Sequence, residues 1–294
     1  MFVAVLSDKP ELREQFCKLL GKETNKDDLA FYAVAHGDKL ITLVDPVLYP
    51  EKLQPLLYSL SIADCVVLLV DALSPRVGEL MVALNSLKMD KGILVSALQL
   101  PITGTVIEKY AKVADMQNAK EKLLLLQREQ GGEQTIALLD KSFAVKSVGN
   151  VALGVVKSGK IKKHDKLVLF PDKKEIEVRT LQIHDKDSEE TIAGDRFGMA
   201  YKGELVDRGL LIPLRNEFEV NTIVNGRFMQ SPFFKDELKG RIHAYSNFQF
   251  IEGNVFENEL KLSKPLAFEK GELIVVADAS NQKLRIAGVF QSKW

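Results

Sequence analysis

The sequence predicts an α/β domain followed by two antiparallel β-barrels. Over the first 118 residues, apolar runs of strand length alternate with amphipathic segments of helix length, which is typical of a mostly parallel sheet flanked by helices. From Thr135 onward, short β-runs are separated by turn signals, a pattern typical of small barrels. We expect a hinge at Gly131-Gly132 and a second break near Pro213, where a proline interrupts a run. The expected domains are residues 1–131, 132–209 and 210–294.

The α/β domain begins with a short apolar run, Phe2–Leu6, which is predicted to be a strand. Residues Pro10–Leu20 follow with the spacing of an amphipathic helix. Asp8 is the expected N-cap, and Pro10 occupies the first turn, where a proline is tolerated. The expected buried face of this helix holds Leu12, Phe16, Leu19 and Leu20.

Two strands, a helix and a further strand are predicted next. Leu29–Ala35 and Lys39–Val44 have strand-like composition and are separated by a turn at His36-Gly37-Asp38. Leu53–Ile62 has helical spacing. Cys65–Val70 is an uninterrupted apolar run, as expected of a strand buried on both faces.

The rest of the domain alternates in the same way. Gly78–Lys88 is predicted to be an amphipathic helix, and Gly92–Ser96 a second buried strand. Thr103–Val113 and Lys120–Gln130 are predicted to be helices that close the domain.

Composition and charge exclude several classes of protein. Apolar residues make up 46% of the chain and charged residues 27%, so sizeable cores and an ordinary polar surface are expected. Forty basic and forty acidic residues cancel, so a polyanion site has to be a local patch, and neither DNA nor a membrane is an expected partner. Cys17 and Cys65 lie in apolar contexts and are expected to be buried, reduced thiols of a cytoplasmic protein. The four histidines lie on separate predicted elements, so neither a metal site nor histidine-based catalysis is expected.

Residues 138–209 carry the most specific pattern in the chain. The ordered motif residues are Asp140-Lys141-Ser142-Phe143, Gly149, Gly154–Gly159, Val178-Arg179 with Gln182, and Ala193–Gly198. In this order and spacing, the stretch resembles the second domain of translational GTPases of the elongation factor Tu and selenocysteine-specific elongation factor kind. Any small barrel needs glycines at tight turns, but the ordered polar residues favour this family.

The remainder of the chain resembles the same family more weakly. Lys239–His243 and Leu284–Val289 are similar to parts of the third barrel in the selenocysteine-specific branch. That branch has a fourth, mRNA-hairpin-binding domain, and the sequence ending at Trp294 does not include one. The resemblance therefore implies a degenerate P-loop GTPase-like, doubly wound domain followed by two β-barrel domains.

The phosphate-binding motif that the resemblance implies is absent from the first domain. In the motif G-x-x-x-x-G-K-[ST], backbone N–H groups surround the phosphates. Here the first predicted strand continues into Ser7-Asp8-Lys9-Pro10-Glu11, which has no glycine and brings two carboxylates. The sequence Gly21–Thr24 has a Gly-Lys pair, but it follows a helix, and Glu23 replaces the hydroxyl residue.

The other nucleotide motifs are altered as well. Asp45 matches the aspartate of Asp-x-x-Gly, but Leu48 stands at the glycine position and Tyr49 at that of the family's histidine. Asp45 is either a remnant of that motif or a carboxylate that ends a strand. Where the family has Asn-Lys-x-Asp, the chain has Ser96–Gln99. We expect a degenerate nucleotide site at Ser7, Asp8, Asp45 and Ser96, with GTP binding lost, no cofactor and no enzymatic activity.

One site carried over by the resemblance lies in the second domain. In the selenocysteine-specific branch, a pocket on this barrel accommodates the aminoacyl end of tRNA. The matching residues here are Asp140, Lys141 and Arg196. A carboxylate suits an ammonium group, and two cations suit an anionic side chain. Lys141 replaces the family's arginine or histidine, which weakens bidentate recognition. Alternatively, Asp140 and Arg196 simply pair with each other.

A lysine-rich stretch in the same domain is a candidate for contacts with RNA phosphates. The candidates are Lys157, Lys160, Lys162, Lys163 and Lys166. Such a patch binds RNA with salt-sensitive affinity, although a lysine-rich turn can also be only a solvated hairpin. The sequence thus predicts a non-catalytic translation elongation factor-like protein that binds tRNA, the ribosome or another translation factor. The alternatives are a protein-interaction scaffold without RNA binding and, with least support, an enzyme with a rebuilt nucleotide site.

Overall fold

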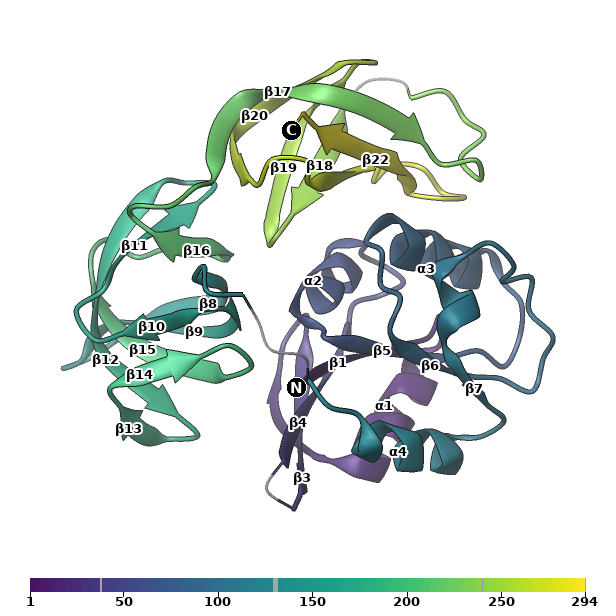
Figure 1. Cartoon of the computed structure of the whole chain (residues 1–294), viewed down its shortest axis with the longest axis horizontal. Coiled ribbons are helices and arrows are strands. Elements are labelled where there is room, and N and C mark those ends of the chain that lie inside the picture. The colour runs from purple at the N-terminus through teal and green to yellow at the C-terminus, as the bar shows by residue number, and fades with distance from the viewer. Residues whose placement is uncertain (38, 129–131, 239–240, 294) are drawn as a thin grey trace. The chain divides into compact units, whose positions relative to one another are not determined.

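The computed structural model describes residues 1–37, 39–128, 132–238 and 241–293, and its parts are drawn in Figure 1. The chain divides into two compact units. One contains Met1–Arg128, residues 229–238 and Val275–Val289. The other contains the second domain and the rest of the C-terminal barrel. The expected hinge at Gly131-Gly132 lies partly outside the described residues, as does Asp38 of the expected turn.

The first domain is built on a mixed, mostly parallel sheet of seven strands. Their order is β2-β3-β4-β1-β5-β6-β7, and β4, β1, β5, β6 and β7 run parallel to one another. The strands are β1 (Phe2–Leu6), β2 (Lys22–Lys26), β3 (Ala30–His36), β4 (Lys39–Asp45), β5 (Cys65–Leu69), β6 (Gly92–Val95) and β7 (Ala111–Val113). Every residue of β1 and β5 is buried, as expected for central strands covered on both faces.

Four helices cover the two faces of this sheet. They are α1 (Pro10–Leu20), α2 (Gln54–Ile62), α3 (Pro75–Ser86) and α4 (Met116–Leu125). Figure 1 shows α1 and α4 on one face and α2 and α3 on the other. Phe16 of α1 and Leu123 of α4 accordingly belong to one core cluster with the side chains of the strands.

The structure corrects three expectations for this domain. Thr103–Val113 is not a helix: it contains a single 3₁₀ turn, Val106–Lys109, and then β7, which adds a fifth parallel strand. Lys9, not Asp8, is the N-cap of α1, and no side chain caps that helix. Phe16 is buried, and Leu12 and Leu20 are partly buried against the core cluster, as expected; the fully buried face of α1 nevertheless differs from the expected one. It holds Arg13, Phe16 and Cys17, whereas Leu19 is exposed.

The second domain is a closed barrel of six strands. The ring runs β11-β16-β8-β9-β15-β12, and the pairing of β12 with β11 closes it. These strands are β8 (Ile136–Val145), β9 (Gly149–Ser158), β11 (Lys166–Phe170), β12 (Lys174–Ile183), β15 (Arg196–Lys202) and β16 (Gly209–Pro213). A short strand β13 (Lys186–Ser188) extends β12, and β10 (Lys160–Lys162) pairs separately with β14 (Glu190–Ile192). Because β16 pairs with β8 and β11, the strands of this barrel extend to Pro213.

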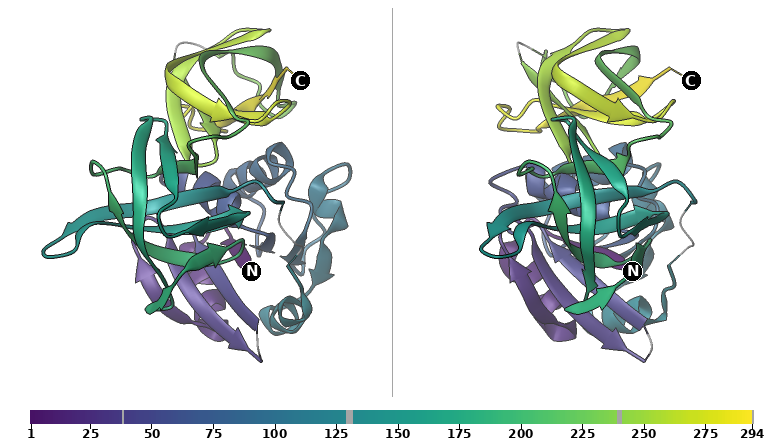
Figure 2. Two further views of the ribbon diagram at one scale, coloured as in Figure 1. Left: turned by 60° about the vertical axis from the view of Figure 1, so that its left-hand side comes forward. Right: turned by 90° about the vertical axis from the view of Figure 1, so that its left-hand side faces the viewer.

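The C-terminal part forms a second closed six-stranded barrel, whose curved strands are drawn in Figure 2. Its order is β17-β20-β19-β18-β21-β22. The strands are β17 (Glu219–Gln230), β18 (Ile242–Ser246), β19 (Gln249–Val255), β20 (Glu259–Phe268), β21 (Leu273–Ala277) and β22 (Ile286–Ser292). Lys239 and Gly240, from one motif of the sequence resemblance, lie outside the described residues.

Candidate functional site

The carboxyl ends of the parallel strands β1, β4, β5 and β6 meet at one edge of the first sheet. In open α/β sheets this edge is where ligands bind. All four residues of the expected degenerate nucleotide site lie there, directly after a strand or at its last position: Ser7 and Asp8 after β1, Asp45 at the end of β4, and Ser96 after β6.

A residue that sequence reasoning missed, Arg13, occupies the interior beneath this edge. Its side chain is fully buried, with 0% exposed. The guanidinium donates from Nε to Asp45 Oδ1 (2.6 Å) and from Nη1 to the carbonyl of Ser7 (2.7 Å). It also donates from Nη2 to the carbonyls of Tyr49 (2.8 Å) and Pro46 (3.1 Å). Arg13 thus ties the end of β1 to the segment that follows β4.

Asp45 is only 5% exposed and is the ionic partner of Arg13. Burial raises the pKa of the Asp45 carboxyl, and the neighbouring charge of Arg13 opposes that shift. Of the two interpretations left open by the sequence, a strand-ending carboxylate accounts for this geometry, because Asp45 compensates a buried cation of its own chain.

The other residues at the edge are also engaged within the protein. Asp8 Oδ2 accepts a hydrogen bond from Ser74 Oγ (2.7 Å), and Ser74 caps the N-terminus of α3. Lys9 Nζ forms an ion pair with Asp71 Oδ2 at 2.6 Å. Ser96 Oγ accepts a hydrogen bond from the amide of Leu98 (3.1 Å). Three acidic side chains and a buried arginine therefore occupy the edge at which an anionic ligand would need donors.

In the barrel of the second domain, Asp140 lies at an irregularity of β8. Its neighbours Leu139 and Lys141 pair with Gly154 and Leu153 of β9, so Asp140 is the extra residue of a β-bulge. Its carboxylate Oδ1 accepts from Arg208 Nη2 (2.7 Å), and its carbonyl accepts from Arg208 Nε (3.0 Å). Asp140 is buried, so this two-point contact fixes the carboxylate.

Arg196 begins β15 on the other side of β9, where it pairs with Val155. Burial lowers the pKa of its guanidinium, and the charge of Asp140 opposes that shift. The structure therefore brings Asp140 and Arg196 into electrostatic range, with Arg208 as a second cation that the sequence interpretation did not include. Lys141, the third expected pocket residue, is exposed on β8.

Three of the candidate RNA-contact lysines lie opposite carboxylates. Lys160 Nζ and Lys162 Nζ lie 3.4 and 3.8 Å from Glu190 Oε2. Lys163 Nζ lies 2.6 Å from Glu189 Oε1. The amide of Lys162 also donates to Asp165 Oδ2 (2.7 Å). Around β10 and β14, three lysines thus meet three acidic residues, and the local charge balances. The other two candidates, Lys157 and Lys166, lie on β9 and at the start of β11.

The sequence holds a partial signal for each of the two site residues that were not predicted, Arg13 and Arg208. Arg13 is three and four positions before Phe16 and Cys17, the spacing of one helical face. Arg208 directly precedes Gly209 at the start of the last strand of the second domain's barrel, but its contact with Asp140 spans 68 residues. Within the described ranges, no cluster of three histidine, cysteine, aspartate or glutamate residues could hold a metal ion. No described helix is long and apolar enough to span a membrane.

Comparisons with known proteins agree with the architecture. Residues 149–208 match the family described as elongation factor Tu domain 2. An uncharacterized protein of Methanocaldococcus jannaschii is 32% identical over 291 residues, which is 92% of this chain and 94% of that protein. The selenocysteine-specific elongation factor of the same organism is 35% identical over 77 residues, 25% of this chain and 16% of that protein. Elongation factor 1-alpha of Nanoarchaeum equitans is 33% identical over 110 residues, 36% of this chain and 23% of that protein.

Solved structures share the whole fold at low sequence identity. Translation elongation factor SelB of Methanococcus maripaludis, in complex with the GTP analogue GppNHp, superposes with a TM-score of 0.81 at 18% identity. The alignment covers 100% of this chain and 79% of SelB. The apo form of the same factor gives a TM-score of 0.76 at 17% identity, with the same coverage.

Proposed function

Because the chain belongs to a translational GTPase-like family, we propose that it is a non-catalytic translation elongation factor-like protein that binds tRNA or the ribosome through its β-barrels, with GTP binding lost. The observation that carries the proposal lies in the barrel of the second domain, where the match to elongation factor Tu domain 2 coincides with the grouping of Asp140, Arg196 and Arg208. A carboxylate bonded to Arg208 and within electrostatic range of Arg196 offers an acceptor for an ammonium group, and the guanidinium groups offer donors for an anionic group.

The loss of GTP binding is supported by the carboxyl edge of the first sheet. A bound nucleotide would bring several negative charges to an edge that carries Asp8, Asp45 and Asp71. Arg13, the buried cation there, is already engaged by Asp45 and by three backbone carbonyls. The Arg13 guanidinium could therefore bind a nucleotide only if those hydrogen bonds broke.

Thermal unfolding with nucleotide tests this part of the proposal. A ligand present at 100 times its dissociation constant stabilises the native state by about 2.7 kcal/mol. We expect GTP, GDP and ATP with Mg²⁺ to leave the melting temperature unchanged at sub-millimolar concentration. A rise of several degrees would show that a nucleotide site remains.

Fluorescence anisotropy with aminoacylated and deacylated tRNA tests the main proposal. Asp140→Ala and Arg196→Ala are expected to reduce the preference for aminoacylated tRNA while leaving the salt dependence nearly unchanged, since these residues face the aminoacyl end and not phosphates. Each phosphate contact contributes roughly 0.7–0.9 to the slope of log affinity against log salt.

The lysine candidates are tested by charge reversal at Lys160, Lys162 and Lys163. If they contact phosphates, the triple glutamate variant binds tRNA more weakly and with a flatter salt slope than the wild-type protein. The matched control reverses three lysines of the first domain, Lys91, Lys112 and Lys122, and has the same net charge. Equal weakening by both variants would indicate only a general effect of net charge.

A second candidate function is a protein-interaction scaffold without RNA binding. It is favoured by the balanced charge around β10 and β14, where Glu189 and Glu190 already pair with the lysines. Absence of binding to tRNA and to ribosomal subunits at low salt would reject the RNA proposal in favour of the scaffold.

A further inference from the structure

The segment Pro46–Glu51, which follows β4, is bonded by guanidinium groups at both of its ends. Arg13 binds the carbonyls of Pro46 and Tyr49 from the side of the sheet. Arg285 Nη1 donates to the carbonyl of Glu51 (3.2 Å) at the other end of the segment. Between these points, the amide of Tyr49 donates to the carbonyl of Pro46 (2.9 Å). Both ends of one short segment are therefore tied to side chains distant in sequence.

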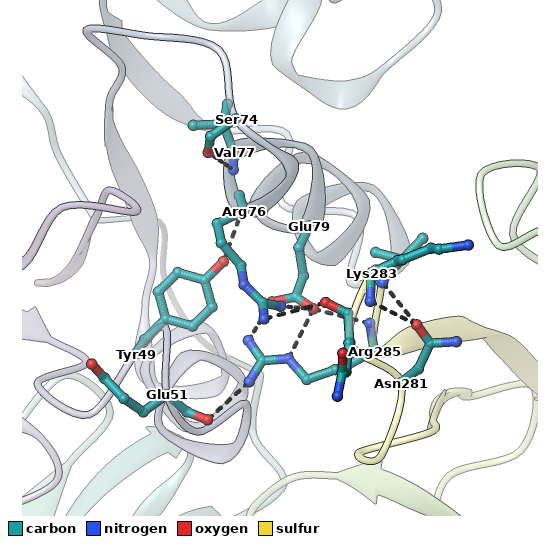
Figure 3. A network of polar contacts seen from close by, with 11 residues as sticks. Tyr49, Glu51, Ser74, Arg76, Val77, Glu79, Asn281, Lys283 and Arg285 are labelled. Atoms are coloured by element: carbon teal, nitrogen blue, oxygen red, sulfur yellow. Dashed lines mark hydrogen bonds and ion pairs between the residues drawn. The ribbon is translucent and has the colours of Figure 1, made fainter.

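The Tyr49 side chain contacts helix α3 and the Arg285 guanidinium. It is fully buried, and its hydroxyl donates to the carbonyl of Arg76 (3.0 Å) in the first turn of α3. Its ring centre lies 5.7 Å from the guanidinium carbon of Arg285, a distance at which cation–π attraction operates. Figure 3 shows Tyr49, Arg76 and Arg285 around one centre.

The acceptor at that centre is Glu79 of α3, a carboxylate with no exposed surface. Glu79 Oε2 accepts from the Nε (2.9 Å) and the backbone amide (3.0 Å) of Arg285, and Glu79 Oε1 accepts from Arg285 Nη2. Arg76 Nη1 lies 3.4 Å from both carboxylate oxygens. Arg285 precedes β22, and Val275–Val289 belongs to the same compact unit as α3.

Because these charges are buried, breaking only some of the bonds between them is energetically unfavourable. A buried carboxylate is tolerated only when it is paired and its oxygens are hydrogen-bonded. Removal of one partner from such a pair leaves an uncompensated buried charge. Release of Arg285 from Glu79 would also remove the donor to Glu51 and the cation beside the Tyr49 ring.

We propose that Arg13 and the Arg285–Glu79 pair form one latch that holds Pro46–Glu51 in a single conformation without any ligand. Two side-chain cations at opposite ends of the segment supply the interactions that fix it. The segment then keeps the same conformation whether or not a nucleotide or an RNA is present. The latch does not depend on RNA binding, so a failure of the proposed function would leave it untouched.

Native-state hydrogen exchange tests the latch at two amides, Tyr49 and Lys52, which donate to the carbonyls of Pro46 and Leu48 at 2.9 and 2.8 Å. Arg285→Gln is expected to accelerate their exchange by about 100-fold, because a buried pair is broken. The matched control is Arg128→Gln, which removes a partly buried ion pair with Asp64 in the same unit but does not touch the segment. The control is expected to leave both rates at the wild-type value.

The result that overturns the proposal is an Arg285→Gln protein in which exchange accelerates around β22 and α3 but not at Tyr49 and Lys52. A change in these two rates on addition of GTP with Mg²⁺ to the wild-type protein would also overturn it. If Arg285→Gln does not fold, Tyr49→Phe keeps the ring and removes only the hydrogen bond to Arg76. Tyr49→Phe is expected to accelerate the same two amides by roughly 5-fold, and unchanged rates would contradict the latch.

Discussion

Replacement of Arg13 by methionine tests the interior of the first domain most directly. Methionine keeps an unbranched, flexible side chain but removes the guanidinium, and with it four hydrogen bonds of 2.6 to 3.1 Å. Asp45 would remain as a buried carboxylate without its cation. Removal of one partner from a buried ion pair costs about 3–5 kcal/mol, and we expect a loss of that size in the free energy of unfolding.

The loss should depend on pH in a defined direction. In the Arg13→Met protein, burial raises the pKa of Asp45 in the folded state with no neighbouring guanidinium to oppose it. A carboxyl with a raised folded pKa destabilises the folded state as pH rises above its unfolded pKa. The variant should therefore approach wild-type stability as pH falls, and Arg13→Met combined with Asp45→Asn should cost less than the sum of the two single changes.

Urea unfolding followed by far-ultraviolet circular dichroism measures this loss, because all described α-helices lie in the first domain. Lys18→Met is the matched control on the same helix. Lys18 forms an exposed ion pair with Glu14, with side chains 61% and 40% exposed, and solvent-exposed pairs of this kind contribute little to stability. If Arg13→Met were no more destabilising than Lys18→Met, Arg13 would not be the buried ionic centre of the domain.

Two further predictions concern the cores. Burial raises the pKa of Cys17 well above its ordinary value and that of Cys65 to about 12, so a thiol reagent should modify both only at the rate of unfolding, and rapid modification of the native protein would contradict their burial. Gly209→Ala should destabilise the barrel of the second domain by about 1–3 kcal/mol, because a Cβ there would lie 2.0 Å from the carbonyl oxygen of Phe170. Gly198→Ala is the control, since its Cβ would meet only a side chain at 3.5 Å, and equal melting temperatures for the two variants would refute the steric argument.

Much of the fold could be predicted because periodicity and turn signals are local. The strands Phe2–Leu6 and Cys65–Leu69 follow from uninterrupted apolar runs, and in the structure they pair in parallel as β1 and β5. The predicted helix at Thr103–Val113 was wrong because the last three residues of this region pair with β6. A strand of that length carries no periodic signal of its own, and tertiary pairing decides its conformation.

In the candidate sites too, residues with a local signal could be predicted, and residues placed by distant contacts could not. The motif residue Asp140 could be placed from local sequence, but its partner Arg208 could not, because a contact across 68 residues depends on barrel closure. Arg13 was missed for another reason. An arginine on an apolar helical face is ordinarily assigned to solvent, and only the position of Asp45 at the end of β4 makes its burial favourable.

The groups that bind Arg13 differ in kind from the groups that bind an anion. Anion sites are built from backbone N–H groups that point toward the ligand, whereas the groups around Arg13 are the carbonyl oxygens of Ser7, Pro46 and Tyr49. The electrostatic polarity of this interior is therefore opposite to that of a phosphate cradle. Side-chain substitutions cannot invert it, because each peptide unit would have to rotate so that its amide replaced its carbonyl. A phosphate cradle at this edge would thus require a different path for the backbone after β1 and β4, and not only the exchange of individual side chains.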